Sequence, residues 1–139
     1  MSTYTQAMNA LRARLDTFTG LPRFWPNDEQ APTPTTAPDG FVFSEGRLLD
    51  EGPVSIGPNG YRFHRDTGEF VVYVYVPRGT RVGTAEGYAD QIRSLFQLTT
   101  VSDLIITSRV IGSGQIVDSD LGKYYAIPIV ISFYTDRTE

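Results

Sequence analysis

The side chains that could do chemistry are few in this sequence, and they stand far apart. The 139 residues contain no cysteine and one histidine, His64, which excludes thiol catalysis, disulfides and metal sites built on histidine pairs. Arg62 and Arg65 lie beside His64, and their positive charges disfavour the protonated imidazole. A general base near neutral pH has to be unprotonated, so His64 could act as one. No motif places a serine or carboxylate to use that base, so a surface histidine is the favoured interpretation.

The acidic residues that could pair for catalysis or bind a metal fall in predicted loops. They are Asp28 and Glu29, Asp50 and Glu51, and Asp118 and Asp120. The triplet 118–120 resembles half of a calcium loop, but the remaining ligands and the terminal glutamate are missing. A glycosidase pair is assembled in space, so spacing along the chain does not exclude one. Solvated turn residues are the favoured interpretation, and the sequence predicts no metal site.

A glycine-rich turn from Gly79 to Gly83 follows a predicted strand and precedes a predicted helix, which is the context of a phosphate-binding loop. The P-loop spacing fails because no Lys-Ser/Thr pair follows Gly83, and the flanking elements form no βαβ unit. A plain connection is therefore favoured, with no cofactor and no enzyme activity. A small ligand-binding or hydrolytic domain that uses the turn at 79–84 is the alternative from a different functional class.

Two segments predict amphipathic helices. The first begins at a capping box formed by Thr3 and Gln6 and ends near Gly20. Its apolar stripe consists of Ala7, Leu11, Leu15 and Phe18. The second begins at Thr84, a good N-cap residue. Its stripe consists of Ala85, Ala89, Ile92 and Phe96. Both stripes have helical spacing, so each helix should bury one side against a sheet.

The strands are predicted from alternating and β-branched residues. They span residues 41–43, 61–65, 69–76, 103–117 and 123–135. A hairpin loop at 66–68 joins the second strand to the third, and residues 112–114 interrupt the fourth. Strand 69–76 is apolar or amphipathic on both faces, so both should meet protein. The predicted fold class is α+β, a mostly antiparallel sheet of about five strands with two amphipathic helices packed on one face, in the order α-β-β-β-α-β-β.

Length and charge set the remaining expectations. One domain over residues 1–139 is predicted, with long exposed loops at about 26–40 and 46–60, where prolines and Gly-Pro steps concentrate. The net charge of −4 and the scattered basic residues argue against specific nucleic-acid binding. No apolar stretch reaches the roughly 18 residues of a membrane span. The polar first residues carry no leader pattern, so synthesis in the cytoplasm is expected.

Several short motifs occur together in an order that is informative. They are Phe24-Trp25-Pro26-Asn27 after the first helix, Arg65-Asp66-Thr67-Gly68 before strand 69–76, Pro77-Arg78-Gly79-Thr80 after it, and the final strand from Ala126 to Tyr134. Over about residues 7–135, this pattern resembles the tail terminator (tail completion) proteins of long-tailed bacteriophages and prophages.

The resemblance implies a virion assembly protein without catalysis. Its copies would form a ring, usually of six subunits, that caps the tail tube, joins it to the head and lets DNA pass. The implied partners are other copies, the major tail tube protein and head–neck connector proteins, in a virion tail assembled in the bacterial host cytoplasm. A neck connector or stopper protein is the close alternative. Expected interface residues are Trp25, Asn27, Arg65 and Arg78, although Trp25 equally suits a role in pinning the long loop to the domain.

Overall fold

The computed structural model describes residues 4–24, 40–56, 62–77, 79, 82–96, 100–101, 104–119 and 122–138. Its elements are α1 (Tyr4–Leu15), β1 (Arg23–Phe24), β2 (Phe41–Ile56), β3 (Arg62–Pro77), α2 (Val82–Leu95), β4 (Thr100–Val101), β5 (Leu104–Ile111), β6 (Gln115–Ser119) and β7 (Gly122–Thr138). Because β1 and β4 have only two residues each, five longer strands dominate the sheet. The predicted α+β class and element order are confirmed.

All the described strands belong to one sheet, with the order β1-β2-β3-β7-β5-β4. The short β1 runs parallel to β2, and the other pairs are antiparallel. Strands β5 and β6 pair with successive parts of the same edge of β7. Residues 112–114 separate them, so the predicted interruption of this strand is confirmed.

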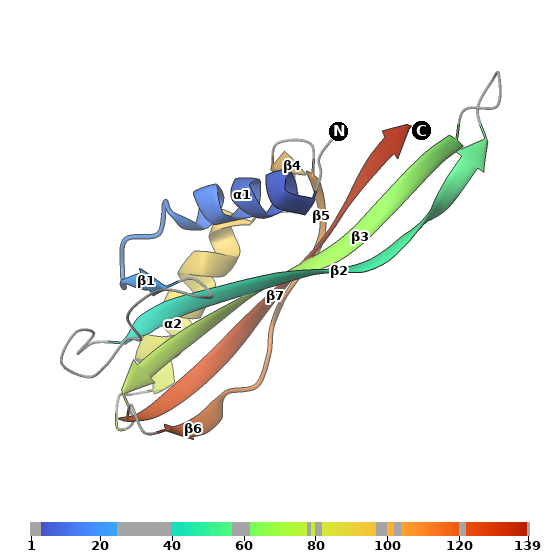
Figure 1. The fold of residues 1–139 in the computed structure, drawn as a ribbon. Helices are drawn as coiled ribbons and strands as arrows, with labels where there is room; N and C mark the ends of the chain where they lie inside the picture. The colour runs from blue at the N-terminus through green and yellow to red at the C-terminus, as the bar shows by residue number, and fades with distance from the viewer. Residues whose placement is uncertain are drawn as a thin grey trace.

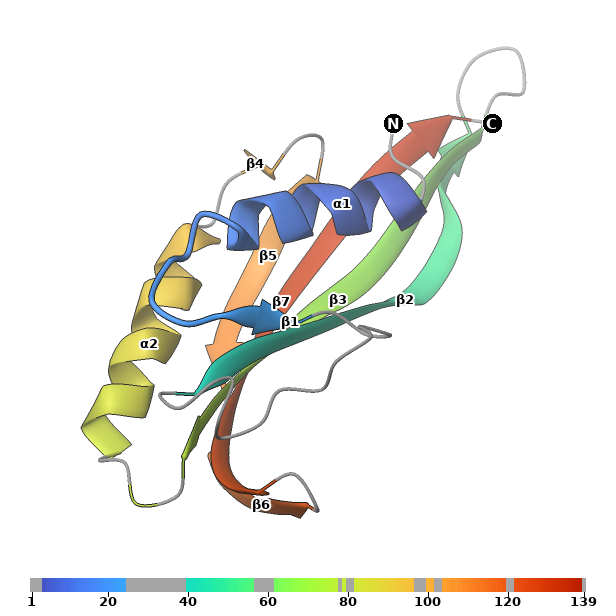
Figure 2. The same cartoon turned by 60° about the vertical axis from the view of Figure 1, so that its left-hand side comes forward.

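Both helices lie on the same face of the sheet (Figures 1 and 2). Both predicted stripes are buried, and the last residue of each lies just beyond the end of its helix: Ala7, Leu11, Leu15 and Phe18 for α1, and Ala85, Ala89, Ile92 and Phe96 for α2. They meet the inward-facing residues of β3 and β7, among them Phe70, Val72, Val74, Ile127, Ile129, Ile131 and Phe133. The Phe70 and Phe96 rings, 5.9 Å apart, join β3 to the end of α2. The period of each element therefore predicted the core correctly. Helix α2 begins at Val82, two residues before the expected cap at Thr84.

Strand β3 is continuous from Arg62 to Pro77, so the predicted hairpin loop at 66–68 is wrong. Gly68 is not a turn residue, because it pairs with Phe133 inside the sheet. A Cβ at Gly68 would lie 2.6 Å from the Phe133 ring and 2.7 Å from the Arg47 carbonyl oxygen. The glycine therefore permits close packing inside a strand rather than a reversal of the chain.

Strand β2 continues to Ile56, which corrects the loop predicted at about 46–60 up to that residue. The ladder with β3 shifts register between Leu48 and Asp50 and again between Pro53 and Ser55. Among the described strands, none pairs with the outer side of β2 at this point. The irregularities therefore accommodate the Gly-Pro step, because proline is tolerated at sheet edges and bulges. Residues 57–61, and residues 26–39 of the other predicted loop, lie outside the described part of the chain.

The far ends of β2, β3 and β7 continue past the helices in both views (Figures 1 and 2). They form a three-stranded extension, in which Ile56 pairs with Arg62 and Phe63 pairs with Thr138. We call this extension the arm. Among the described residues, no helix is long and apolar enough to cross a membrane.

Candidate functional site

The face of the sheet opposite the helices carries the most distinctive surface of the described chain. Side chains alternate along a strand, so every second residue of β2, β3 and β7 points to this side. These residues are Phe41, Phe43, Glu45 and Arg47 on β2, Arg65, Glu69, Val71, Tyr73 and Tyr75 on β3, and Ala126, Pro128, Val130, Tyr134 and Asp136 on β7. We call this set the open face.

One end of the open face is an aromatic cluster. Phe41 and Tyr75 stack with centroids 4.6 Å apart and planes 13° apart, and Tyr124 meets both rings edge-on. Phe43 and Tyr73 form a neighbouring pair at 6.5 Å. Such pairs contribute about 0.5–1.5 kcal/mol each beyond their area burial. Burial raises the pKa of the Tyr75 and Tyr124 hydroxyls, because it disfavours the phenolate.

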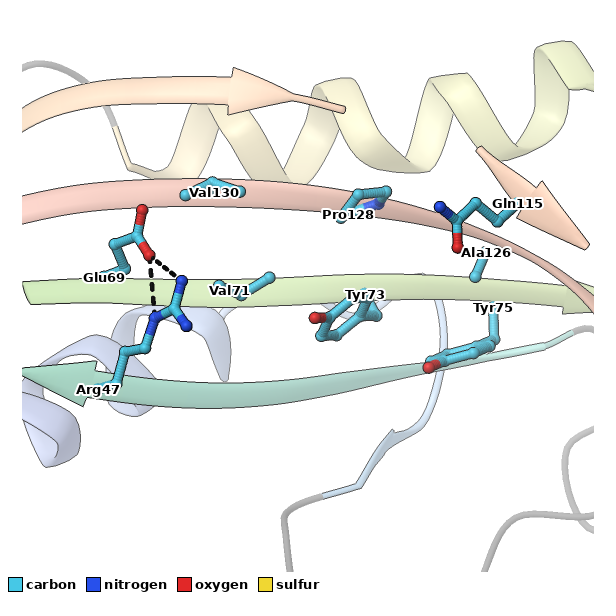
Figure 3. A pocket seen from close by; sticks show the side chains of 9 residues that line it. All are labelled: Arg47, Glu69, Val71, Tyr73, Tyr75, Gln115, Ala126, Pro128 and Val130. Carbon is cyan, nitrogen blue, oxygen red and sulfur yellow. Dashed lines mark hydrogen bonds and ion pairs between the residues drawn. The ribbon is translucent and has the colours of Figure 1, made fainter. Parts of the chain in front are cut away.

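A shallow groove of about 380 Å³ runs beside this cluster (Figure 3). Its lining residues are Arg47, Glu69, Val71, Tyr73, Tyr75, Gln115, Ala126, Pro128 and Val130. The small side chains of Ala126, Pro128 and Val130 form one wall, and the Tyr73 and Tyr75 rings stand across from it. In this lining the only carboxylate is Glu69, which is paired with Arg47. The groove therefore offers apolar contact and hydrogen bonding, without a free acid–base pair.

The polar groups of the open face are mostly paired within the chain. The Tyr73 hydroxyl donates to Glu45 Oε1 at 3.1 Å, and its pKa is raised by burial first and by the Glu45 charge second. Arg47 donates to Glu69 Oε1 from Nη2 at 2.6 Å and from Nε at 3.1 Å. This hydrogen bonding raises the Arg47 pKa. Each bond crosses from β2 to β3, so the pairs hold these strands in register.

A second ion pair ties β3 to β7 in the arm. Arg65 donates from Nε to Asp136 Oδ1 at 2.8 Å and from Nη2 to Oδ2 at 3.1 Å. The Arg65 guanidinium also lies 4.0 Å from the centre of the Tyr134 ring, within cation–π range. Its hydrogen bonds lower the pKa of Asp136. The open face is therefore aromatic at one end and ion-paired at the other.

Of the four residues predicted for interfaces, only Arg65 belongs to the described part of the chain. Trp25, Asn27 and Arg78 lie outside it. The Arg65 side chain serves the arm itself through Asp136 and Tyr134, and a role at an interface stays a prediction. The sequence predicted part of the open face. It indicated that both faces of strand 69–76 meet protein, because one face carries Val71, Tyr73 and Tyr75.

The structure places three of the remaining chemical candidates in strands. His64 lies in β3 opposite Arg137, and Asp50 and Glu51 lie in β2. Gly79 has a φ of 98°, a backbone conformation that glycine adopts readily in turns. Residues 80 and 81 of the glycine-rich turn lie outside the described part of the chain. No three His, Asp or Glu side chains among the described residues are grouped as metal ligands would be.

Helices cover one face of the sheet, and the other face bears aromatic rings and an arginine-rich set of ion pairs, side chains that are enriched at protein interfaces. The comparison with protein families identifies the class of protein. The family model described as phage tail terminator protein matches residues 6–133, so the chain belongs to that family. The resemblance seen in the sequence is confirmed. The family is one of structural phage tail proteins rather than a known enzyme family, which makes this chain a structural component of the phage tail.

Solved structures confirm the fold over nearly the full length. One chain, from the virion of a native gene transfer agent particle, has a TM-score of 0.53 and 12% identity, with 97% of this chain and 100% of that chain covered. Another has a TM-score of 0.50 and 22% identity, with 91% and 94% covered. At these identities the likeness concerns the fold. The comparison with curated proteins returned no match.

Proposed function

We propose that copies of this protein form a ring that caps the phage tail tube and joins it to the head, with six subunits as the resemblance implies. The observation that carries the proposal is the open face in a chain whose family is that of tail terminators. The described helices lie on one face of the sheet only, and the other face bears stacked aromatic rings (Figure 1). Aromatic residues and arginine are enriched at protein interfaces.

The charge of the chain suits a ring through which DNA passes. Each copy carries a net charge of −4, so a closed ring accumulates negative charge in proportion to its copy number. A bore that shares this charge repels the phosphate backbone and keeps DNA from adhering. The ring would be assembled in the bacterial host cytoplasm and kept in the virion tail.

The partners follow from the position at the end of the tube. One side of the ring contacts the major tail tube protein, and the other contacts head–neck connector proteins. We retain Trp25, Asn27, Arg65 and Arg78 as proposed interface residues. For Arg65 the contact would form on the arm, where its guanidinium is already oriented by Asp136.

Electron microscopy tests the proposal directly. Purified protein is added to purified tail tubes, and discs are counted at the two tube ends and along the shaft. We expect one disc at one end of each tube. Uniform decoration of the shaft would make the chain a tube subunit and would contradict the proposal.

A binding assay separates the cap from a neck connector or stopper. The protein is immobilised and offered tail tube protein and portal-side neck proteins separately. Capture of tube protein is the expected result for a tail cap. Capture of portal-side proteins alone would transfer the protein to the neck and overturn the position proposed here.

A further inference from the structure

The groove on the open face is lined for an uncharged occupant. Its two charged side chains, Arg47 and Glu69, bond to each other, so the described lining presents no free charge. Apart from Gln115, the other described lining residues are aliphatic, aromatic or proline. Next to the groove, Val110 pairs with Val130 of the lining and is 55% exposed. A charged occupant would lose hydration here without gaining an ion pair, which favours a neutral one.

The shape and hydrogen-bonding groups of the groove suit an extended proline-rich chain. The lining on β3 runs from Tyr75 to Glu69, a length of about 20 Å at the rise of a strand. Grooves that bind polyproline II segments are lined by aromatic rings, against which the proline rings pack. The Gln115 amide extends toward Pro128 (Figure 3), where it can donate to a carbonyl oxygen of such a segment.

The chain contains a segment of matching chemistry between β1 and β2. Residues 30–38 include Pro32, Pro34 and Pro38 and no charged residue. Prolines at this density favour the polyproline II conformation, in which residues 32–38 would span about 19 Å. The segment and the groove therefore agree in charge and in length.

The connection between β1 and β2 is longer than the positions of its ends require. Phe24, the last residue of β1, pairs with Phe43, and the described chain resumes at Gly40. These ends are about 11 Å apart at the spacings of a sheet, whereas residues 25–39 span up to about 50 Å when extended. Connections of this length in compact domains usually have a function of their own. The surplus length is sufficient to bring residues 30–38 to a neighbouring molecule.

We propose that residues 30–38 of one subunit bind in the open-face groove of the next subunit. The proposal rests on the proposed ring and specifies one of its contacts. The segment and the groove are different surfaces of the chain, so the contact is heterologous, and a fixed rotation repeated at each contact closes a ring. Each chain carries one segment and one groove, so a closed ring fills every groove. A segment that is already extended loses little conformational freedom on binding.

Disulfide trapping locates the segment, because the chain has no cysteine of its own. Gln115→Cys on the groove wall is combined in turn with Thr33→Cys, Thr35→Cys or Thr36→Cys, and tube-bound protein is oxidised mildly. At least one combination should give a ladder of covalent multimers in a denaturing gel, while each single variant should stay monomeric. A disulfide needs Cα atoms within about 7 Å of each other, so a ladder requires that the segment reach the groove of another copy.

The controls identify the occupant of the groove. Thr35→Cys with Arg14→Cys places the second cysteine on the exposed side of α1, on the other side of the sheet, and should give no ladder. Disulfides formed within single chains, detected by peptide mass mapping, would place the segment in its own groove and overturn the proposal. A ladder from Thr35→Cys alone would place segment against segment and overturn it as well.

The same experiment separates this contact from the proposed function. Discs at tube ends without a disulfide from any combination would refute the segment contact and leave the cap intact. A ladder from concentrated protein that forms no discs on tubes would refute the cap and support the segment contact. Absence of both discs and ladder would refute both.

The prolines give an independent measurement. Replacing all three, in a variant with Pro32→Ala, Pro34→Ala and Pro38→Ala, should lower the fraction of capped tubes by about tenfold or more, because alanine loses the ring contacts and the preformed extended conformation. The matched control keeps the prolines and carries Thr33→Ala, Thr35→Ala and Thr36→Ala, and it should cap tubes as the parent does. Urea unfolding of both variants should match that of the parent. Normal capping by the proline variant, or equal loss in both variants, would contradict the proposal.

Discussion

The two faces of the sheet are built from the same strands, yet they are stabilised differently. The helix-covered face contains aliphatic and phenylalanine side chains that are almost fully buried, such as Val72 and Phe70. The open face contains tyrosines and cross-strand ion pairs, such as Tyr73 and the pair of Arg47 with Glu69. Helices exclude water from one face, so dispersion and apolar burial dominate there. The other face keeps polar groups that are mostly paired within the chain, such as Tyr73 with Glu45 and Arg47 with Glu69.

The comparison shows that one face of the sheet supplies the buried core, while the other face carries the side chains that can contact a partner. A substitution on the covered face should reduce stability strongly. One on the open face should reduce stability little and act mainly on assembly. Each prediction below compares the two faces, from the largest expected effect to the smallest.

Phe70→Ala and Tyr73→Ala compare the faces directly, because both residues are aromatic and both lie on β3. Phe70 is buried against Phe96, so its truncation should lower the free energy of unfolding by about 3–5 kcal/mol. Tyr73 is only half-buried, and its truncation should cost about 1 kcal/mol. Urea denaturation measures both values. Equal losses would contradict the comparison.

Gly68→Ala tests the close packing that makes β3 continuous. The added Cβ meets the Phe133 ring and the backbone oxygen of Arg47, neither of which moves easily, so we expect a loss of about 1–3 kcal/mol. Gly87→Ala is the control, because a Cβ there meets nothing within 4 Å and α2 gains helix propensity. That variant should gain about 0.4–1 kcal/mol in the same urea assay. A neutral Gly68→Ala would disprove the packing explanation.

Tyr73→Phe examines the polar side of the open face. Burial and then Glu45 raise the Tyr73 pKa, so the folded state favours the neutral phenol. The stabilising contribution is full below the phenol's ordinary pKa and is lost as pH rises through the raised value. Stability of the parent should therefore fall more steeply in alkali than that of Tyr73→Phe. Glu45→Gln should remove only part of the shift in a tyrosinate absorbance titration, since burial is the larger cause.

Asp136→Asn should have the smallest effect, because the pair with Arg65 is exposed and screened by solvent. Hydrogen bonds from Arg65 lower the Asp136 pKa, so the contribution is present above the carboxyl's ordinary pKa and disappears as pH falls through the lowered value. The parent should lose slightly more stability than Asp136→Asn during acid titration. The difference should shrink in about 1 M salt. A difference that persists in salt would contradict a screened surface pair.

Much of the fold could be predicted because it follows from periodicity within short segments. The stripe of Ala7, Leu11 and Leu15 repeats with the helical period, and the alternation from Ile127 to Phe133 repeats with the strand period. Each pattern identifies a buried side without knowledge of the partner. The family resemblance was also recognisable from short motifs along the chain.

The candidate site was less predictable because its residues meet only through register. Tyr73 was recognised as part of an amphipathic face, but the bonds between Arg47 and Glu69 and between Tyr73 and Glu45 needed β2 to continue beyond residue 43. Glycine and proline signals in β2 indicated a loop. Local sequence could not show that β3 provides a partner strand along that length.

The sequence by itself determined which sides of the helices and of strands β3 and β7 are buried, because the spacing of apolar residues within one segment identifies its buried side. Only the tertiary structure decided that Gly68 continues a strand and that β2 reaches Ile56, because both depend on neighbours distant in sequence. It also decided which strands form the sheet edges. Edges arise from the order of strands in space, and that order is a property of the assembled sheet.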